Sequence, residues 1–321
     1  MPSPVQRSYL LPMQPHVVDA EQQGSTLASA LRRAEPGLPW SRARTLCERG
    51  KVRVNGELAL DPARRLQAGD RIELDRGAPD ARVRSLDDAA VRHLDRQVIV
   101  IEKPSGLMTV PFDESEIDTL LSRGQTWLRR REGAGLAQLH AVQRLDKDTT
   151  GLLVFARTLA ARKHLQRQFR VHSVERRYVA LAHGVLTRPR TVETDLIPDR
   201  GDGLRGSFGH FRKPRGPLPE DAQHAVTHVT PREMLRAATL VECRLETGRQ
   251  HQIRIHMSEL GHPLLGEPVY IRDYQGPKLP APRPMLHAGV LGFVHPGTEE
   301  RVRFESEPPP DFASVLERLR R

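Results

Sequence analysis

The apolar runs of this chain are short, and this limits the folds that are open to it. The runs from Val98 to Ile101 and from Leu152 to Ala156 have the length of buried strands, whereas the segments 27–34 and 159–169 have the spacing of amphipathic helices. No apolar run reaches the roughly 18 residues of a membrane-spanning helix, and no internal repeat of fixed period occurs. We therefore expect an α+β protein of the cytoplasm, without a membrane anchor.

The charge balance indicates the chemistry of the partner. Fifty Lys and Arg stand against 40 Asp and Glu, which gives a formal net charge of +10 and a pI of about 10.2. Such an excess suits a polyanion, although arginine scattered over a solvated surface gives the same composition. Cys47 and Cys243 lack the spacing of a metal or disulfide framework, so we expect reduced, buried thiols.

Changes of pattern divide the 321 residues into four parts. We expect an N-terminal tail over 1–24, a small helix–helix–sheet domain over 25–76, a charged linker over 77–95 and a larger domain over 96–321. Within the larger domain, the Gly- and Pro-rich stretches 198–231 and 276–284 predict long surface loops.

The small domain carries a recognisable order of short motifs. Two helices are expected over 27–34 and 41–49, the second capped by Ser41 and ended by Gly50, followed by strands that meet at the Asn55-Gly56 turn. Ser41-Arg42, the G-K-V-R-V-N-G segment over 50–56 and the G-D-R-I segment over 69–72 resemble the S-four-type RNA-binding domain. The basic residues expected to hold RNA phosphates there are Arg42, Arg44, Lys51 and Arg53.

The densest polar segment is Q-R-L-D-K-D-T-T-G over 143–151, immediately before an apolar strand. Taken alone, it is compatible with a surface turn in which the acids cap the chain. The segment resembles the H-R-L-D-x-x-T-S-G motif of the RluA family of pseudouridine synthases, with Gln143 in place of histidine and Thr150 in place of serine. The resemblance makes Asp146 the catalytic nucleophile.

Further motifs of that family follow in the same order. They are V-I-V-I-E-K-P-S-G-L over 98–107, R-R-Y-V-A-L over 176–181, L-E-T-G-R-Q-H-Q-I-R-I-H over 245–256, L-H-A over 286–288 and H-P over 295–296. Gln250 stands where the family has threonine, and Glu267 stands where it usually has aspartate. Together the resemblance spans residues 97 to 304.

The resemblance implies a mixed, largely antiparallel sheet and a reaction that needs no cofactor and no metal. Tyr178 would stack on the target uracil, and Arg249 would pair with the nucleophile. Arg144 would fill the space of the flipped base or bind the flipped backbone. From their charge alone, Lys103 and Arg254 are candidate phosphate contacts, although solvated surface charge explains them equally well. The implied partner is RNA, ribosomal rather than transfer RNA, and we expect a monomer.

Two other functions stay open from the residues alone. A non-catalytic RNA-binding or ribosome assembly protein would explain the departures at Gln143 and Gln250. A metal-assisted nuclease or phosphotransferase would use Asp146, Asp148 and nearby histidines. His251 and His256 are five residues apart, however, whereas a zinc pair on one helical face needs a spacing of four.

Overall fold

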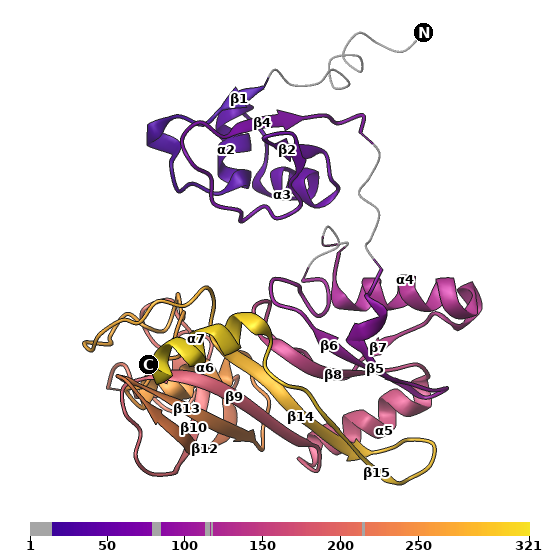
Figure 1. Ribbon diagram of the computed structural model, residues 1–321, viewed down its shortest axis with the longest axis vertical. Coiled ribbons are helices and arrows are strands. Elements are labelled where there is room, and N and C mark those ends of the chain that lie inside the picture. Colours follow the sequence, from indigo (N-terminus) through magenta and orange to yellow (C-terminus); the bar gives the residue numbers. More distant parts are fainter. Residues whose placement is uncertain (1–14, 79–84, 113–115, 117, 214–215) are drawn as a thin grey trace. The chain divides into compact units, whose positions relative to one another are not determined.

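The computed structural model describes residues 15–78, 85–112, 116, 118–213 and 216–321 (Figure 1). They form two compact units, of which the first holds residues up to 85 with 110–126 and the second holds 86–109 with 127–321. Each unit has its own sheet and apolar core. Within these ranges, no helix has the length and apolar character needed to cross a membrane.

The first unit packs two helices on a small sheet whose strand order is β1-β4-β2-β3. Leu31, Leu46 and Ile72 lie in its buried core, as does the free thiol of Cys47. The elements are α2 (Leu27–Ala34), α3 (Trp40–Glu48), β1 (His16–Val17), β2 (Val52–Val54), β3 (Glu57–Leu58) and β4 (Arg71–Leu74). The sequence therefore predicted both helices and the sheet of this unit.

Two turns of this unit show where local sequence rules hold and where they fail. Asn55 (φ 56°) and Gly56 (φ 79°) form the expected left-handed turn between β2 and β3. The expected cap of α3 is wrong, because the helix begins at Trp40 and its N-cap is Pro39, which forms no side-chain hydrogen bond.

The second unit is built on one large mixed sheet, whose order is β11-β10-β12-β13-β9-β14-β8-β6-β5, with β15 paired to β14 and β7 paired to β8. In the part of the chain that the structure describes, β8 and β14 run parallel and the other pairs run antiparallel. This confirms the expected α+β class. The strands are β5 (Val91–Leu94), β6 (Val98–Lys103), β7 (His140–Ala141), β8 (Thr150–Ala156), β9 (Glu175–His183), β10 (Arg190–Ile197), β11 (Gly206–Ser207), β12 (Gln223–Leu235), β13 (Ala238–Leu245), β14 (Leu286–Val294) and β15 (Arg301–Glu305).

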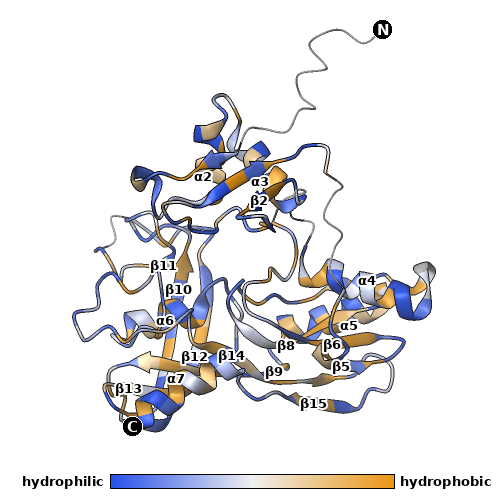
Figure 2. Ribbon diagram, turned by 45° about the horizontal axis from the view of Figure 1, so that its top comes forward, coloured by the Kyte–Doolittle hydropathy of each residue, from blue (hydrophilic) through white to orange (hydrophobic). Residues whose placement is uncertain are grey.

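Among the described residues, three helices pack on the sheet of the second unit. α5 packs through Leu165 on β8 and β14, α6 packs through Ile255 beside β10 and β12, and α7 packs through Phe312 near β9 and β13 (Figure 1). Figure 2 shows hydrophobic residues along the strands and hydrophilic residues in the loops and at the end of α4. The helices of the second unit are α5 (Leu159–Arg170), α6 (Gln252–Glu259) and α7 (Pro310–Arg320), and the residues of α4 (Leu120–Glu132) are divided between the two units after residue 126.

Two segments differ from the sequence-based expectation. β5 lies inside the stretch 77–95 that was expected to be a linker, and it pairs with β6. β12 begins at Gln223, inside the expected loop 198–231, and pairs with both β10 and β13. Charged and Pro-containing strands of this kind lack a continuous apolar pattern, because one face or one end of each is exposed.

Candidate active site

The Asp146 loop, defined as residues 145–151, connects β7 to β8 and is fixed by hydrogen bonds. Thr109 Oγ1 donates to the Leu145 carbonyl (2.8 Å) and accepts from the Leu145 N–H (3.0 Å). Lys103 Nζ donates to the Lys147 carbonyl at 2.7 Å, and Arg283 Nη1 donates to the Asp148 carbonyl at 3.1 Å. Backbone on both sides of Asp146 is thereby held in place.

The end of this loop is joined to β14, far away in the sequence. Gly151 has φ 110°, and a Cβ atom there would lie 2.3 Å from the Ala288 carbonyl oxygen, so only glycine fits without displacement. Thr150 Oγ1 lies 2.9 Å from His287 Nδ1. The glycine of the motif thus permits the close parallel pairing of β8 with β14.

Asp146 faces an arginine from helix α6. Arg254 Nη1 lies 3.5 Å from Asp146 Oδ2, and Arg254 also forms a bidentate pair with Glu267, with both distances 2.7 Å. The side chain of Glu267 is 0% exposed and that of Arg254 is 8% exposed. Burial favours the neutral form of Arg254, but the Glu267 hydrogen bonds and the charges of Glu267 and Asp146 raise its pKa.

Tyr178 is buried close enough to Asp146 for the carboxylate charge to act on its hydroxyl. It lies on β9 between Cys243 of β13 and Ala288 of β14 and is buried. Burial raises the pKa of its hydroxyl, the Arg176 charge lowers this pKa, and the Asp146 charge raises it further. The side chain is therefore a neutral phenol.

His251 occupies the N-cap of α6 with φ 58° and ψ 16°, a left-handed conformation that is uncommon for a residue other than glycine. Its Nδ1 lies 2.8 Å from the hydroxyl of Tyr270, and the two rings meet edge to face. The Arg254 guanidinium lies 5.3 Å from the centre of the Tyr270 ring. Pairwise contacts therefore connect Asp146 to Arg254, Arg254 to Tyr270, and Tyr270 to His251 in one polar cluster.

A carboxylate paired with an arginine and a buried tyrosine lie within the part of the chain that matches a family of RNA enzymes. The family model described as RNA pseudouridylate synthase matches residues 97–259, and the model described as S4 domain matches residues 26–72. This chain belongs to the RNA pseudouridylate synthase family. It is an RNA pseudouridine synthase, an isomerase, with an S4 domain ahead of its catalytic part.

Similar proteins extend over most of the synthase. It is 35% identical to the uncharacterized RNA pseudouridine synthase YlyB of Bacillus subtilis, covering 88% of this chain and 90% of that one. It is 33% identical to ribosomal large subunit pseudouridine synthase D of Zymomonas mobilis, covering 96% and 98%. The structure of human RNA pseudouridylate synthase domain containing 4 shares the fold, with a TM-score of 0.58, 24% identity and coverage of 72% and 93%.

The arginine that lies beside Asp146 is not the one that the sequence predicted. Arg249, expected beside the nucleophile, lies in the turn before α6, where its Nε donates to the His224 carbonyl (2.9 Å). Arg254 was expected to contact phosphate, yet it is the arginine at Asp146. Residue order within the motif does not reveal this, because only the phase of α6 decides which side chain faces the loop.

Lys103 also differs from expectation. It is fully buried, and Nζ donates to the carbonyls of Pro104 (2.9 Å), Leu107 (2.7 Å) and Lys147 (2.7 Å). Its three donors are therefore used within the protein, and no donor is left for a phosphate. Burial lowers its pKa to about 7, against the opposite effect of the Asp148 and Asp146 charges.

The remaining expected RNA contacts lie at the surface of their own units. Arg42 and Arg44 are exposed on α3, and Arg53 is exposed on β2, where its Nη1 donates to the Gly56 carbonyl (2.9 Å). Lys51 is half-buried and its Nζ donates to the Ala78 carbonyl. Arg144, in the second unit, is exposed two residues before Asp146.

The two departures from the family motif lie in different surroundings. Gln250 is exposed, so its side chain is not part of the packing around Asp146. Gln143 is half-buried, and its Nε2 is a buried donor without a hydrogen-bond partner in the described residues. We therefore expect glutamine at position 143 to lower the free energy of unfolding more than glutamine at position 250 does.

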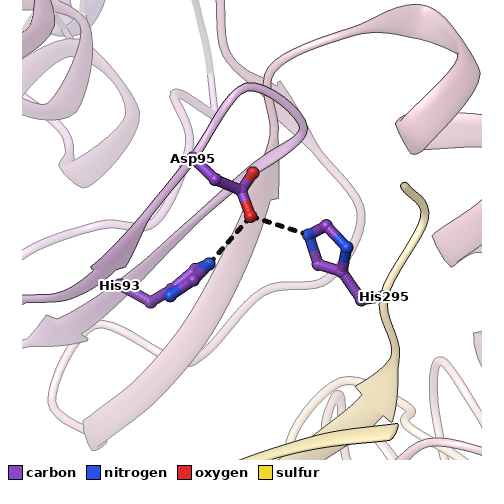
Figure 3. Close-up of side chains that lie close together, drawn as sticks. All are labelled: His93, Asp95 and His295. Atoms are coloured by element: carbon purple, nitrogen blue, oxygen red, sulfur yellow. Dashed lines mark hydrogen bonds and ion pairs between the residues drawn. The ribbon is translucent and has the colours of Figure 1, made fainter. Parts of the chain in front are cut away.

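A second polar cluster joins the β5–β6 turn to the end of β14 (Figure 3). Asp95 Oδ2 lies 2.9 Å from His93 Nε2 and 2.7 Å from His295 Nε2. These three groups are close enough to hold a metal ion. However, His295 Nδ1 accepts from the N–H groups of Gly297 (3.2 Å) and Thr298 (3.1 Å), which places the imidazole proton on Nε2. Nε2 lies close to Asp95 but does not form a hydrogen bond within the described residues. The cluster is a carboxylate bridging two imidazoles.

Proposed function

We propose that this synthase isomerises specific uridines of large-subunit ribosomal RNA in the cytoplasm. Relatives named ribosomal large subunit pseudouridine synthase D, at 33% and 36% identity, support this RNA, and the net charge of +10 suits it. We propose the domain bounds 25–76 and 96–321, with the linker over 77–95 shortened by β5, which belongs to the sheet of the larger domain. We also propose a monomer that uses neither cofactor nor metal. A non-catalytic RNA-binding protein is not favoured, because the nucleophile motif and the family match are retained.

The reaction needs a carboxylate with a fixed position. The bond between N1 of uracil and C1′ of ribose breaks, the base turns, and C5 bonds to C1′. We propose Asp146 as the nucleophile that holds the detached intermediate. The observation that carries the proposal is the Asp146–Arg254 pair, since Arg254 is itself fixed by the buried Glu267 and so orients the carboxylate.

The target uridine must leave its stack to reach Asp146. Extrusion costs a few kcal/mol, and stacking on the Tyr178 ring would recover part of it. Exposed Arg144 would fill the vacated space. Arg249 would bind the flipped nucleotide from the turn before α6. Arg42, Arg44, Lys51 and Arg53 would hold RNA phosphates on the S4 domain, independently of the chemistry.

Asp146→Asn tests this function, with Asp148→Asn as the matched control from the same loop. Pseudouridines are mapped by chemical labelling and sequencing in ribosomal RNA from cells that carry each variant. We expect Asp146→Asn to reduce turnover at least about 10³-fold with RNA affinity retained, and Asp148→Asn to keep the modification. Wild-type turnover of Asp146→Asn would refute the nucleophile, and an unchanged map on deleting the gene would refute the substrate.

A further inference from the structure

Isomerisation also moves protons, and this requirement is separate from the nucleophile. When C5 has bonded to C1′, it still carries its hydrogen, which must leave so that the C5–C6 double bond is restored. N1, released from the ribose, must gain a proton. A proton acceptor is therefore required beside the rejoined base, and the following inference rests on the proposed site around Asp146.

Few groups near Asp146 are able to accept a proton. Lys103 and Arg254 are donors already bound within the protein, and burial raises the pKa of Tyr178, and that of Tyr270 to about 12, so both phenols stay protonated. Glu267 is 0% exposed and accepts from Arg254 and two backbone N–H groups.

The charges of Asp148 and Asp146 both act on the buried Lys103 ammonium and raise its pKa. The charge of Asp146 is also the strongest of those acting on His251. His251 is thus the neutral acceptor that remains beside the proposed nucleophile.

His251 is held in one orientation by local structure. Its left-handed backbone starts α6, and Arg254, three residues later on the same helix, reaches Asp146. The hydrogen bond from Nδ1 to Tyr270 fixes the ring. Nε2 has no hydrogen-bond partner in the described parts of the chain, and it is not among their buried unpaired atoms. Nε2 is therefore open to contact with a bound base.

We propose that His251 is a catalytic residue that removes the C5 proton of the rejoined base through Nε2. In the proposed tautomer, Nδ1–H donates to the Tyr270 oxygen, 2.8 Å away, and this tautomer leaves the Nε2 lone pair as acceptor. The electron pair of the C5–H bond restores the C5–C6 double bond, the C6–N1 π pair moves onto N1, and imidazole becomes imidazolium. The imidazolium then releases the proton to water, and N1 takes a proton from water, so no net proton is gained or lost.

The charges around His251 suit an acceptor at neutral pH. Burial lowers its pKa below the ordinary 6.5; Asp146 and Glu267 raise it, whereas Arg254 and Arg205 lower it. Tyr270, the remaining neighbour, is neutral. Because the acceptor must be deprotonated, turnover should be full at pH 7 and fall as pH decreases through this pKa.

The test uses transcribed large-subunit ribosomal RNA with hydrogen or deuterium at C5 of uridine, under single turnover. His251→Asn retains a residue that tolerates the left-handed backbone but has no acceptor nitrogen. We expect turnover to fall about 10²-fold or more with RNA affinity retained, and the C5 isotope effect to rise well above that of the wild type. His164→Asn, on α5, should match the wild type in both.

Two outcomes would overturn the proposal: wild-type turnover of His251→Asn, or slower turnover with an unchanged isotope effect, which would indicate a structural role. If His251→Asn fails to fold, Tyr270→Phe keeps the imidazole without its orienting bond. That variant should show slower turnover with an increased isotope effect, and wild-type behaviour of both readouts would overturn the proposal. Asp146→Asn separates the two ideas, since its activity bears on the nucleophile alone.

Discussion

Replacing Glu267 by Gln should destabilise the second unit more than any comparable change at its surface. The Glu267 carboxylate is 0% exposed and holds Arg254 through two bonds of 2.7 Å. Breaking a buried pair by removing one charge costs roughly 3–5 kcal/mol. The Gln oxygen still accepts from the backbone N–H groups of Val269 and Tyr270, so we expect the lower end, about 3 kcal/mol.

Urea unfolding at pH 7, followed by circular dichroism, measures this effect, and about 3 kcal/mol corresponds to a fall in Tm of roughly 6–12 °C. Glu233→Gln is the matched control, because Glu233 binds Arg320 with the same two-bond geometry (2.9 and 2.7 Å) but on the surface. Its loss should be far smaller, since exposed pairs are screened by water and salt. Equal losses in the two variants would refute the argument that burial sets the strength of the Arg254 pair.

Three further predictions concern pH, backbone and RNA. Burial keeps His256 neutral and lowers its pKa to about 4 from 6.5. Its contribution to the free energy of unfolding, about 3 kcal/mol, is present in full above pH 6.5 and is lost as the pH falls to 4. A His256→Gln protein with the same acid dependence in urea unfolding would contradict this. Gly151→Ala should cost at least about 2 kcal/mol, because its Cβ meets the backbone, whereas Gly106→Ala, with open space at φ 77°, should cost about 1 kcal/mol; equal thermal shifts would argue against the contact. Arg42→Ala and Arg44→Ala should each reduce the salt dependence of RNA binding, with a slope change of about 0.7–0.9; an unchanged slope in filter binding would exclude a phosphate contact.

Local patterns predicted the elements whose own residues carry a clear signal. Helix α5 begins after Thr158, whose side chain accepts from the Ala161 N–H (3.0 Å), as the capping rule predicts. Strands β6 and β8 were found because their residues are buried on both faces. β12 was missed because its exposed end contains Pro231 and charged residues, and only its pairing with β10 and β13 defines it as a strand.

The sequence predicted which residues belong to the candidate site better than it predicted which of them contact one another. The family motif pointed to Asp146 and Tyr178, and these stay proposals for chemistry. It did not indicate that Arg254 rather than Arg249 lies at Asp146, or that Lys103 is buried below the loop. Both facts depend on distant segments packed around the loop, and sequence spacing carries no information about that packing.

The supports of the Asp146 loop also set the order in which the synthase becomes competent during translation. Asp146 leaves the ribosome well before Arg254 and Glu267, and before Arg283, which donates to the Asp148 carbonyl, and Ala288, which adjoins Gly151. A nascent chain that stops short of these residues holds the Asp146 carboxylate on a loop that, among the described contacts, only Thr109 and Lys103 support. The Asp146 carboxylate therefore gains its full set of contacts only late in synthesis.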